Sequence, residues 1–485
     1  MWINLKSYFL NLISLQTMSK IKKNIFVENA EIVDISSEGK SVAKVDGMVI
    51  FVDGGVPGDV ADVMITRKKN NYAEGHVVTL KKPSENRINP KCEHFGYCGG
   101  CKWQHMTYET QLIFKQKTVE DALTRIGHLD ISTLKPIFAN KESYFYRNKL
   151  EFSFSDKKWL TNEEIKSGVE IDNRNALGFH IPKMFDKILD IKNCYLQEEP
   201  SNSIRNEIRD FANKHNLSFF GVRNKTGLLR TLMIRSSSNG ELMVLIQFFE
   251  NEPENIQLLL NHLKNTFPQI TSLQYVINQK GNDTLQDLEI ITFHGRDHIF
   301  EEMEGLKFKI SAKSFYQTNS TQAYELYKIT RDLCGLTGNE VVYDLYTGTG
   351  TIANFVAKKA KKVIGVEYVE DAVIDAKNNS DFNKIDNTLF FAGDMKDVLN
   401  ESFIATHGKP DVIITDPPRA GMHEDVVRVL LKAAPQKIVY VSCNPATQAR
   451  DLAMMVDNYE IKEIQPVDMF PQTAHVENVV LLVRK

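Results

Sequence analysis

The stretch that decides the fold is residues 341–351, with the sequence VVYDLYTGTGT. Its first five residues are typical of a buried strand, and the glycine-rich turn after them leads into a helix that begins near Ile352. A strand, a glycine turn and a helix in this order form the first unit of an open α/β sheet, whose turn lets a nucleotide-like ligand approach the backbone. The pattern Gly348-x-Gly350-x-x-Ala353 does not identify the ligand by itself, because dehydrogenases share it.

The remainder of the C-terminal region continues this alternation of strands and helices. We expect helices at 371–379 and 424–433, further strands at 363–366, 389–392 and 412–415, and a strand of five residues that runs into Cys443. The segments 461–469 and 476–483 have the pattern of a closing antiparallel pair. The region therefore predicts an α/β fold with a doubly wound parallel sheet.

Polar residues stand where the predicted strands end, and the carboxyl ends of parallel strands line the ligand crevice of such a sheet. Glu367 lies about 20 residues beyond the glycine turn, where an acid accepts hydrogen bonds from ribose hydroxyls. Asp394 ends the next strand and could receive an adenine amine. Asp416 begins the sequence Asp-Pro-Pro-Arg, whose prolines lack N–H groups and stiffen the crevice wall. Together with Gly348, these carboxylates predict a nucleoside cofactor.

Residues 437–445, KIVYVSCNP, run from a predicted strand straight into Cys443. A thiol at the carboxyl end of a strand can act as a nucleophile in the crevice, although a free cysteine is more often a small buried hydrophobe. Glu477 lies on the closing pair and could bring a carboxylate to the same rim. A thiol, a carboxylate and a methyl donor suit methylation of uracil at C5, because C5 is a poor nucleophile until a group adds at C6.

Three cysteines lie close together in the pattern Cys92-x5-Cys98-x2-Cys101, with glycines at 96, 99 and 100 between them. Glycines let a loop wrap closely around a ligand, so this pattern predicts a metal site. One ligand is missing from a site of four, and Cys194, His94 and His105 are the candidates. Structural zinc and an iron–sulfur cluster both fit this spacing.

The N-terminal region, from Ile25 to about Lys82, contains short strands separated by glycine turns. This spacing predicts a small barrel of the OB type, a frequent platform for oligonucleotides. The basic run 67–69 followed by Tyr72 could bind phosphate and stack a base, or could be a solvated turn.

A mixed α+β region follows the cysteines and ends near Ile310. We expect an amphipathic helix at 108–126 and a second helix capped by Ser201 that runs to about Lys214. The runs 229–236 and 241–249 flank Asn239-Gly240, a strong hairpin signal.

The composition is that of an ordinary globular protein, with 485 residues, 42% hydrophobic residues and 25% charged residues. The net charge of −3 gives no general attraction to nucleic acid, so a polyanionic partner requires a local basic patch. Six cysteines are too few for a disulfide scaffold and favour a reduced, cytoplasmic compartment. We interpret residues 1–17 as a dispensable extension, with Met18 as the start, and no segment reaches the length of a membrane span.

Several motifs together resemble those of the RNA (uracil-5-)-methyltransferase family, in particular its bacterial 23S rRNA branch, over about residues 25–485. They are Cys92-x5-Cys98-x2-Cys101 with Cys194, SFYQTN at 314–319, DLYTGTG at 344–350, DPPRAG at 416–421, SCNP at 442–445 and HVE at 475–477.

The resemblance implies a class I, Rossmann-like methyltransferase domain (311–485), a TRAM-type barrel (19–83) and a central α+β domain (84–310). It implies a [4Fe-4S] cluster on Cys92, Cys98, Cys101 and Cys194, with zinc as the other metal. S-adenosylmethionine would be bound through Gln317, Tyr346, Glu367 and Asp416. Cys443 would be the nucleophile and Glu477 the base. The expected substrate is a flipped uridine, uracil 1939, in a single-stranded or loop region of 23S rRNA, and a monomer is expected.

Three other functions remain open at this point. The substrate could be uracil 54 of tRNA, although the tRNA enzymes typically lack the cluster cysteines. The chain could be an RNA-binding assembly factor with a silent methyltransferase domain, against which the intact set of Cys443, Glu477, Asp416 and Gln317 argues. An NAD-dependent oxidoreductase would explain the glycines but leaves the DPPR and SCNP motifs without a role.

Overall fold

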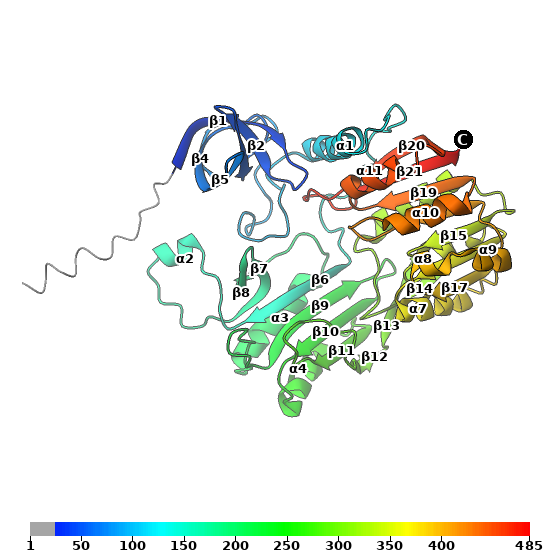
Figure 1. The fold of residues 1–485 in the computed structure, drawn as a ribbon. Helices are drawn as coiled ribbons and strands as arrows, with labels where there is room; N and C mark the ends of the chain where they lie inside the picture. Colours follow the sequence, from blue (N-terminus) through cyan, green and yellow to red (C-terminus); the bar gives the residue numbers. More distant parts are fainter. Residues whose placement is uncertain (1–24) are drawn as a thin grey trace, which may run out of the picture. The chain divides into compact units, whose positions relative to one another are not determined.

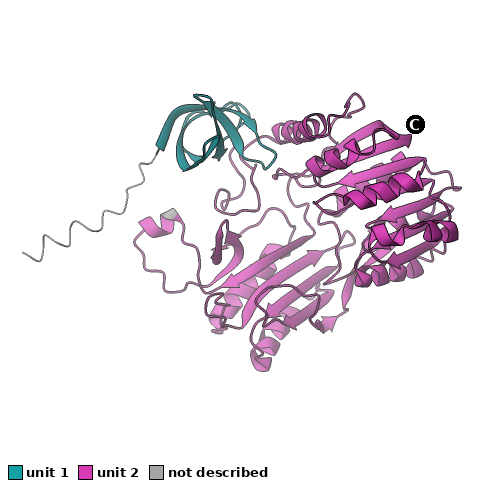
Figure 2. Cartoon of the chain, in the orientation of Figure 1, with its two compact units in different colours: residues 1–87 teal, residues 88–485 magenta. Residues whose placement is uncertain are grey.

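The structure, a computed structural model, describes residues 25–485, except for the side chain of Asn162. The proposed extension 1–17 and the start at Met18 lie outside the described residues. The chain divides into two compact units, residues 1–87 and 88–485, which Figure 2 draws in different colours. Within the described part, no helix is both long and apolar enough to cross a membrane.

The first unit contains a closed barrel of five strands in the order β1-β2-β3-β5-β4, so the prediction of a small barrel is confirmed. Its core is formed by small and β-branched side chains, among them Ala43, Val52 and Val63. At Gly75 the backbone of β4 approaches so closely that an added Cβ would lie 2.5 Å from the Met64 carbonyl oxygen, which explains the glycine. The strands are β1 (Ile25–Ile35), β2 (Ser41–Val45), β3 (Met48–Asp53), β4 (Val60–Lys68) and β5 (Tyr72–Lys82).

The second unit begins with the cysteine segment and helix α1 (Tyr108–Arg125), followed by a seven-stranded sheet in the order β12-β11-β10-β9-β6-β7-β8. Helices α3 (Ser201–Lys214) and α4 (Pro253–Thr266) bury Ile204 and Leu260 in the core of this sheet. The strands are β6 (Lys149–Ser155), β7 (Ala176–Ile181), β8 (Met184–Asp190), β9 (Leu229–Ser236), β10 (Leu242–Phe248), β11 (Ser272–Ile277) and β12 (Ile291–Gly295), and a short helix α2 (Asn162–Lys166) lies between β6 and β7.

Two predictions for this region have different outcomes. The hairpin around Asn239-Gly240 is confirmed, because β9 and β10 pair antiparallel. The prediction that Ser201 caps α3 is wrong: Pro200 occupies the N-cap position, and the Ser201 hydroxyl donates instead to the buried Gln197 side-chain oxygen at 2.6 Å. Ser201 is already the first helical residue, so its hydroxyl serves a tertiary contact.

The C-terminal sheet has the order β17-β16-β15-β18-β19-β21-β20, with the first five strands parallel (Figure 1). The doubly wound sheet and its antiparallel closing pair are therefore confirmed. The strands are β15 (Val341–Leu345), β16 (Lys362–Glu367), β17 (Thr388–Ala392), β18 (Val412–Thr415), β19 (Lys437–Ser442), β20 (Tyr459–Val467) and β21 (Glu477–Arg484), preceded by a two-stranded ribbon of β13 (His298–Met303) and β14 (Leu306–Ser311).

Helices cover both faces of this sheet, because side chains that alternate along each strand point to opposite faces. On β15, Val342 belongs to the core beneath one set of helices and Tyr343 to the core beneath the other. The helices on the first face are α5 (Ser320–Cys334), α6 (Thr351–Ala357) and α7 (Glu370–Phe382), and those on the second are α1, α8 (Met395–Val398), α9 (Glu401–His407), α10 (Glu424–Ala433) and α11 (Pro445–Ala453).

Counted from β15, the strand order is 3-2-1-4-5-7-6, whereas dinucleotide-binding dehydrogenases have the order 3-2-1-4-5-6. The difference is the antiparallel strand β21, which lies between β19 and β20. This insertion argues against the oxidoreductase alternative. It also brings the start of β21 next to the end of β19, where Cys443 lies.

Candidate active site

The glycine turn follows the carboxyl end of β15, at the edge of the parallel sheet where the other predicted site residues lie. Tyr346, Gly348 and Gly350 have left-handed backbone conformations, with φ values of 62°, 55° and 73°. A side chain at Gly350 would meet the Ala376 Cβ at 2.8 Å and the Phe390 ring at 3.0 Å, so only glycine fits the close packing of turn and helix. The turn therefore presents backbone rather than side chains to a ligand.

Glu367 holds this turn in place with both oxygens of its carboxylate. Its Oε2 accepts a hydrogen bond from the Gly348 N–H and its Oε1 from the Val369 N–H, both at 3.0 Å. A carboxylate has about four acceptor positions, so Glu367 keeps capacity for ribose hydroxyls after making these two bonds.

The other predicted cofactor residues lie around the same strand ends. Asp394 follows β17 and caps α8, accepting from the Lys396 N–H at 3.2 Å. Tyr346 is half-buried, and burial together with the negative charge of Asp394 raises its pKa to about 12. Gln317 precedes α5, and its backbone carbonyl accepts from the Asn148 side chain at 2.9 Å.

Two carboxyl groups at neighbouring strand ends have strongly raised pKa values. Burial raises the pKa of Asp416, at the end of β18, to about 7. Burial and the charge of Asp416 raise the pKa of Asp344, on β15, to about 7 as well, although the Thr347 hydroxyl donates to Asp344 at 2.5 Å. Asp344 was not singled out as a site residue from the sequence, because an acid inside a predicted strand gives no sign of its tertiary neighbours.

Cys443 directly follows β19, and Glu477 is the first residue of β21, the strand that pairs with β19. The β19–β21 ladder pairs Ser442 with Asn478, and the same antiparallel register continued by one residue brings Cys443 opposite Glu477. Directly opposite residues in an antiparallel pair have Cβ atoms about 4.5–5.5 Å apart. The nucleophile and the base predicted from the sequence are therefore neighbours.

The surroundings favour the neutral forms of both groups. Glu477 is only 6% exposed, and burial together with the charge of Asp416 raises its pKa to about 8. Burial and the charges of Glu477 and Asp416 raise the pKa of the half-buried Cys443 thiol to about 11. The positive charge of Arg419 acts in the opposite direction on both groups.

Arg419 is held at the rim by its backbone. Its carbonyl accepts hydrogen bonds from the Asn444 side chain at 2.9 Å and from the Thr447 hydroxyl at 3.2 Å, so it is tied to the residues just after Cys443. Its guanidinium lies 3.2 Å from Nδ1 of His475. The side chains of both Arg419 and His475 are exposed, so the positive charge of Arg419 is accessible to an anionic or hydrogen-bond-accepting ligand.

The four predicted metal cysteines lie together in the second unit. Cys92, Cys98, Cys101 and Cys194 all line one cavity of about 820 Å³. Burial, with a further contribution from Cys194 and Cys92, raises the pKa of Cys98 to about 11, which reflects the nearness of these thiols. Within residues 25–485, no group of three or more His, Cys, Asp or Glu side chains has the geometry that a metal ion requires.

The two histidines that were candidates for the fourth ligand are less suitable than Cys194. His94 lines the cavity, but its Nε2 accepts a hydrogen bond from the Lys192 N–H at 3.0 Å. His105 is buried against the Phe95 ring and does not line the cavity.

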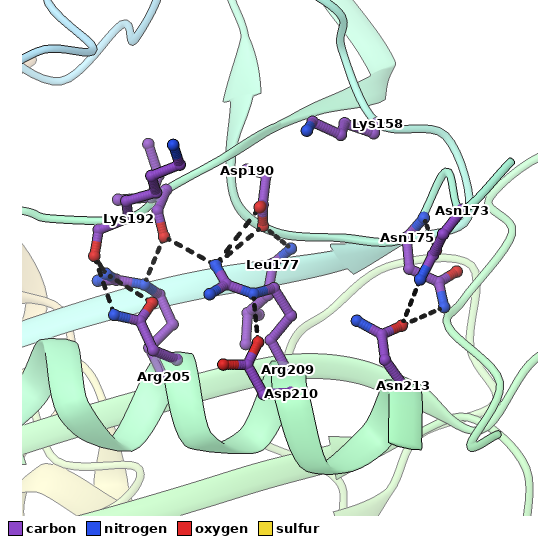
Figure 3. A network of polar contacts seen from close by, with 12 residues as sticks. Lys158, Asn173, Asn175, Leu177, Asp190, Lys192, Arg205, Arg209, Asp210 and Asn213 are labelled. Carbon is purple, nitrogen blue, oxygen red and sulfur yellow. Dashed lines mark hydrogen bonds and ion pairs between the residues drawn. The ribbon is translucent and has the colours of Figure 1, made fainter. Parts of the chain in front are cut away.

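Helix α3 positions Cys194 through a polar network, the part of which around Asp190 and Arg205 is drawn in Figure 3. Arg205 donates to the backbone carbonyls of Ile191 and Lys192. Asn202 accepts from the Cys194 N–H at 2.8 Å and donates to the Cys194 carbonyl at 3.2 Å. The segment that carries the fourth cysteine is therefore fixed by a helix that lies far from the other three in sequence.

Comparison with known proteins gives consistent relatives over nearly the whole chain. Residues 289–485 match the tRNA (Uracil-5-)-methyltransferase family, and residues 27–78 match the TRAM domain. An uncharacterized RNA methyltransferase of Bacteroides thetaiotaomicron is 58% identical over 451 residues, covering 92% of this chain and 99% of the relative. An uncharacterized RNA methyltransferase of Porphyromonas gingivalis is 55% identical over 464 residues, covering 94% of this chain and 99% of the relative.

Among solved structures, the tRNA (uracil-54, C5)-methyltransferase of Pyrococcus abyssi, in complex with S-adenosyl-L-homocysteine, has a TM-score of 0.73 and 27% identity. It covers 94% of this chain, and the whole of that structure is matched. The chain thus has a methyltransferase fold like that of this structure. The chain belongs to the RNA uracil-5-methyltransferase family and is an S-adenosylmethionine-dependent RNA methyltransferase with an N-terminal TRAM domain.

Proposed function

We propose that this protein methylates C5 of a uridine in 23S rRNA, uracil 1939, through a covalent bond between Cys443 and C6 of the uracil. The observation that supports the chemistry is the register of β19 and β21, which pairs Ser442 with Asn478 and, continued by one residue, would bring the Cys443 thiol opposite the buried Glu477 carboxyl. The ribosomal substrate is supported by the four cysteines around one cavity, a set that resembles the ribosomal branch of the family.

In the proposed reaction, the target uridine leaves its stack and enters the crevice. The Cys443 thiolate adds to C6, and the electron pair that develops at C5 takes up a methyl group. S-adenosylmethionine supplies that methyl group as an electrophile. Glu477 then removes the proton from C5, the C5–C6 double bond forms again, and the thiolate leaves.

Ionisation of the Cys443 thiol is the step of this reaction that costs free energy. Ionising an ordinary thiol at pH 7 costs about 2 kcal/mol, and from the sequence alone we expected the same cost for Cys443. A pKa of about 11 corresponds to about 5 kcal/mol. Arg419 and a bound sulfonium, both positive, would lower this cost, so the thiol becomes reactive chiefly when the cofactor is bound.

The cofactor site is proposed to consist of the residues around the glycine turn. Glu367 would accept from the ribose hydroxyls with the capacity that its two backbone bonds leave free. Asp394 would receive the adenine amine, and Asp416 would lie near the positive sulfonium. We assign further contacts with S-adenosylmethionine to Gln317, Tyr346 and the backbone of Gly348.

A [4Fe-4S] cluster on Cys92, Cys98, Cys101 and Cys194 completes the proposal. Four thiols around one cavity are the donor set that such a cluster uses. Zinc held by the same four thiolates is the other metal that this donor set would suit. When bound, the cluster would join the 92–101 segment to residue 194.

The metal proposal has a direct chemical test. Protein purified without oxygen should contain about four iron and four sulfide per chain and absorb in the visible range, and Cys194→Ser should lose most of both. Zinc in place of iron, or unchanged iron in the Cys194→Ser variant, would contradict it.

RNA binding is assigned to the TRAM barrel and the central region. The side chains of residues 67–69, at the end of β4 and directly after it, are exposed, and the Tyr72 ring packs edge-on against Phe51 at 5.7 Å. We propose functional boundaries at 19–83, 84–310 and 311–485, and a monomer that acts in the cytoplasm.

A second substrate, uracil 54 of tRNA, is favoured by the likeness to the Pyrococcus abyssi enzyme. The two substrates are separated by mapping 5-methyluridine by mass spectrometry in the 23S rRNA and tRNA of a deletion strain. Loss from 23S rRNA alone, with recovery by the wild-type gene but not by Cys443→Ala, would support the ribosomal substrate. Loss from tRNA alone would show that tRNA, and not 23S rRNA, is the substrate. No loss from either RNA would favour the assembly-factor alternative.

A further inference from the structure

The connection between β20 and β21 ends at Glu477, and residues 468–473 form its first part. This 468–473 segment is held by residues of the 102–146 region, more than 320 positions earlier in the chain. The contacts are specific and mostly buried, unlike those of an ordinary surface loop.

Two hydrogen bonds join Gln111 on α1 to Gln472, one donated and one accepted by the Gln111 side chain. The Gln111 amide donates to the Gln472 side-chain oxygen at 3.0 Å, and the Gln111 side-chain oxygen accepts from the Gln472 N–H at 2.8 Å. Both side chains are buried, at 0% and 4% exposure. Gln472 has a φ of 68°, an unfavourable conformation for a residue with a side chain, so its surroundings must hold it there.

The segment immediately after Cys101 binds the same residue. The backbone N–H groups of Lys102 and Trp103 both donate to the Gln472 carbonyl, at 2.9 and 3.1 Å. The Gln111 amide also donates to the Trp103 carbonyl at 3.2 Å. Gln472 is thus joined to the chain that leaves the cysteine site as well as to α1.

Two further contacts fix the start of the segment. The Lys115 amine donates to Asp468 at 2.5 Å and to the Phe470 carbonyl at 2.9 Å, and both charged side chains are fully buried. The Tyr146 hydroxyl donates to the Pro471 carbonyl at 2.8 Å. These bonds leave the segment little freedom to shift relative to α1.

The same segment is tied to the cofactor side and to the base. Asn319, two residues after Gln317, donates to the Met469 carbonyl at 2.9 Å. The Thr473 hydroxyl donates to the Phe470 carbonyl at 2.7 Å and accepts from the His475 N–H at 3.3 Å. Glu477 follows two residues later, so a shift at Gln472 would be transmitted to the base.

We infer that Gln111 and Gln472 are positioning residues for Glu477, which they keep opposite Cys443 by holding the 468–473 segment against α1. This inference rests on the proposed function. Neither glutamine contacts the reacting atoms in this account; each acts through the backbone that leads to Glu477. The step that depends on them is removal of the C5 proton, whereas addition of Cys443 to C6 depends on β19, which they do not contact.

The test is to compare Gln111→Leu with Glu477→Gln on a uridine-containing RNA and S-adenosylmethionine. A misplaced base should allow addition and methyl transfer but delay release. We therefore expect multiple turnover to fall at least tenfold, S-adenosylmethionine affinity to change less than twofold, and a methylated protein–RNA adduct to accumulate on a denaturing gel. Gln111→Glu keeps an acceptor for the Gln472 N–H and should recover part of the turnover.

Gln247→Leu is the matched control. Gln247 is also a buried glutamine, hydrogen-bonded to Asn278 at 3.0 Å, but it lies on β10 of the central sheet. The Gln247→Leu variant should lose stability without accumulating adduct.

Gln472→Gly is a second variant in case Gln111→Leu folds poorly, because glycine tolerates a φ of 68° and the carbonyl that binds Lys102 and Trp103 remains. It should also accumulate adduct.

The outcomes separate the inference from the function on which it rests. Adduct with Glu477→Gln but not with Gln111→Leu or Gln472→Gly, when measured per folded protein, would overturn the positioning role alone. Absence of adduct with all three variants, while wild type methylates the RNA, would overturn the proposed roles of Cys443 and Glu477 instead.

Discussion

Glu477 lies across the sheet from Cys443, one position beyond the last pair of the β19–β21 ladder, Ser442 and Asn478. The negative charge of Glu477 makes the thiolate form of the half-buried Cys443 less favourable, because both groups become negative on ionisation. A thiolate and a carboxylate at this spacing need positive charge nearby. Arg419 is at the rim, and the cofactor would bring a second positive charge.

Replacing the nucleophile should abolish methylation without removing the cofactor site. We expect Cys443→Ala to lower methyl transfer by at least about 10³-fold, because no other thiol lies opposite Glu477 in the described chain, while S-adenosylmethionine affinity stays within about threefold. Calorimetry and radiolabelled methyl transfer measure the two quantities. Cys334→Ala is the matched control, since Cys334 is buried at the end of α5, and it should keep its activity. Residual methylation well above background in Cys443→Ala would reject the nucleophile role.

Replacing the base should change the titration of its neighbour. In Glu477→Gln the carboxylate that opposes ionisation of Cys443 is gone, so the thiol pKa should fall below its value of about 11, though burial keeps it above that of an ordinary thiol. The pH dependence of alkylation by iodoacetamide, with the alkylated residue identified by mass spectrometry, measures this pKa. An unchanged profile would mean that the two groups do not interact. This measurement needs no RNA.

Cofactor affinity should depend on pH because the cofactor is a cation. Asp416 and Glu477, with pKa values raised to about 7 and about 8, are largely protonated in the free protein at pH 6 and ionised at pH 9. A sulfonium favours the ionised carboxylates, so its affinity should rise severalfold from pH 6 to pH 9.

S-adenosylhomocysteine provides the control for this pH effect, since it has the same amino-acid group but an uncharged sulfur. Its affinity should rise much less over the same range in a calorimetric titration. Parallel curves for the two ligands would show that neither carboxyl is coupled to the sulfonium.

The raised pKa values also predict how stability changes with pH. A carboxyl whose pKa is raised on folding stabilises the protein fully below its unfolded pKa of about 4, and this contribution is lost as pH rises through the folded value. The free protein should therefore lose stability to urea between about pH 5 and pH 8, and Glu477→Gln should reduce this loss. A loss of the same size in the variant would contradict the raised pKa of Glu477.

The ion pair between Lys115 and Asp468 is fully buried, so removing one partner should be costly. We expect Lys115→Met to lower the free energy of unfolding by about 3–5 kcal/mol, because it leaves the Asp468 carboxylate uncompensated. On the same helix, Lys117 forms a half-exposed pair with Asp121 at 2.8 Å, and Lys117→Met should cost less than about 1 kcal/mol. Urea unfolding of both variants checks the difference, and equal losses would contradict the role of burial.

The local pattern of the sequence was sufficient for most of the secondary structure. The predicted strand 341–345 and helix 424–433 are β15 and α10, because long runs of apolar residues and the glycine turn act within a few neighbouring positions. Ser201 shows the limit of this reasoning. A serine before a helix is a good cap, but the Ser201 hydroxyl donates its hydrogen bond to the buried side chain of Gln197. Asp344 begins the DLYTGTG motif but was not predicted as a site residue, since its neighbours Asp416 and Glu367 are close only in the folded chain.

The sequence by itself determined the order of strands and helices, the barrel, and the motifs at the strand ends, since these depend on residue type and short spacing. Only the tertiary structure decided that β21 lies between β19 and β20, that Glu477 therefore lies opposite Cys443, and that Gln111 binds Gln472. Contacts between residues far beyond neighbouring positions leave no local pattern, because they depend on how complete strands, sheets and helices pack.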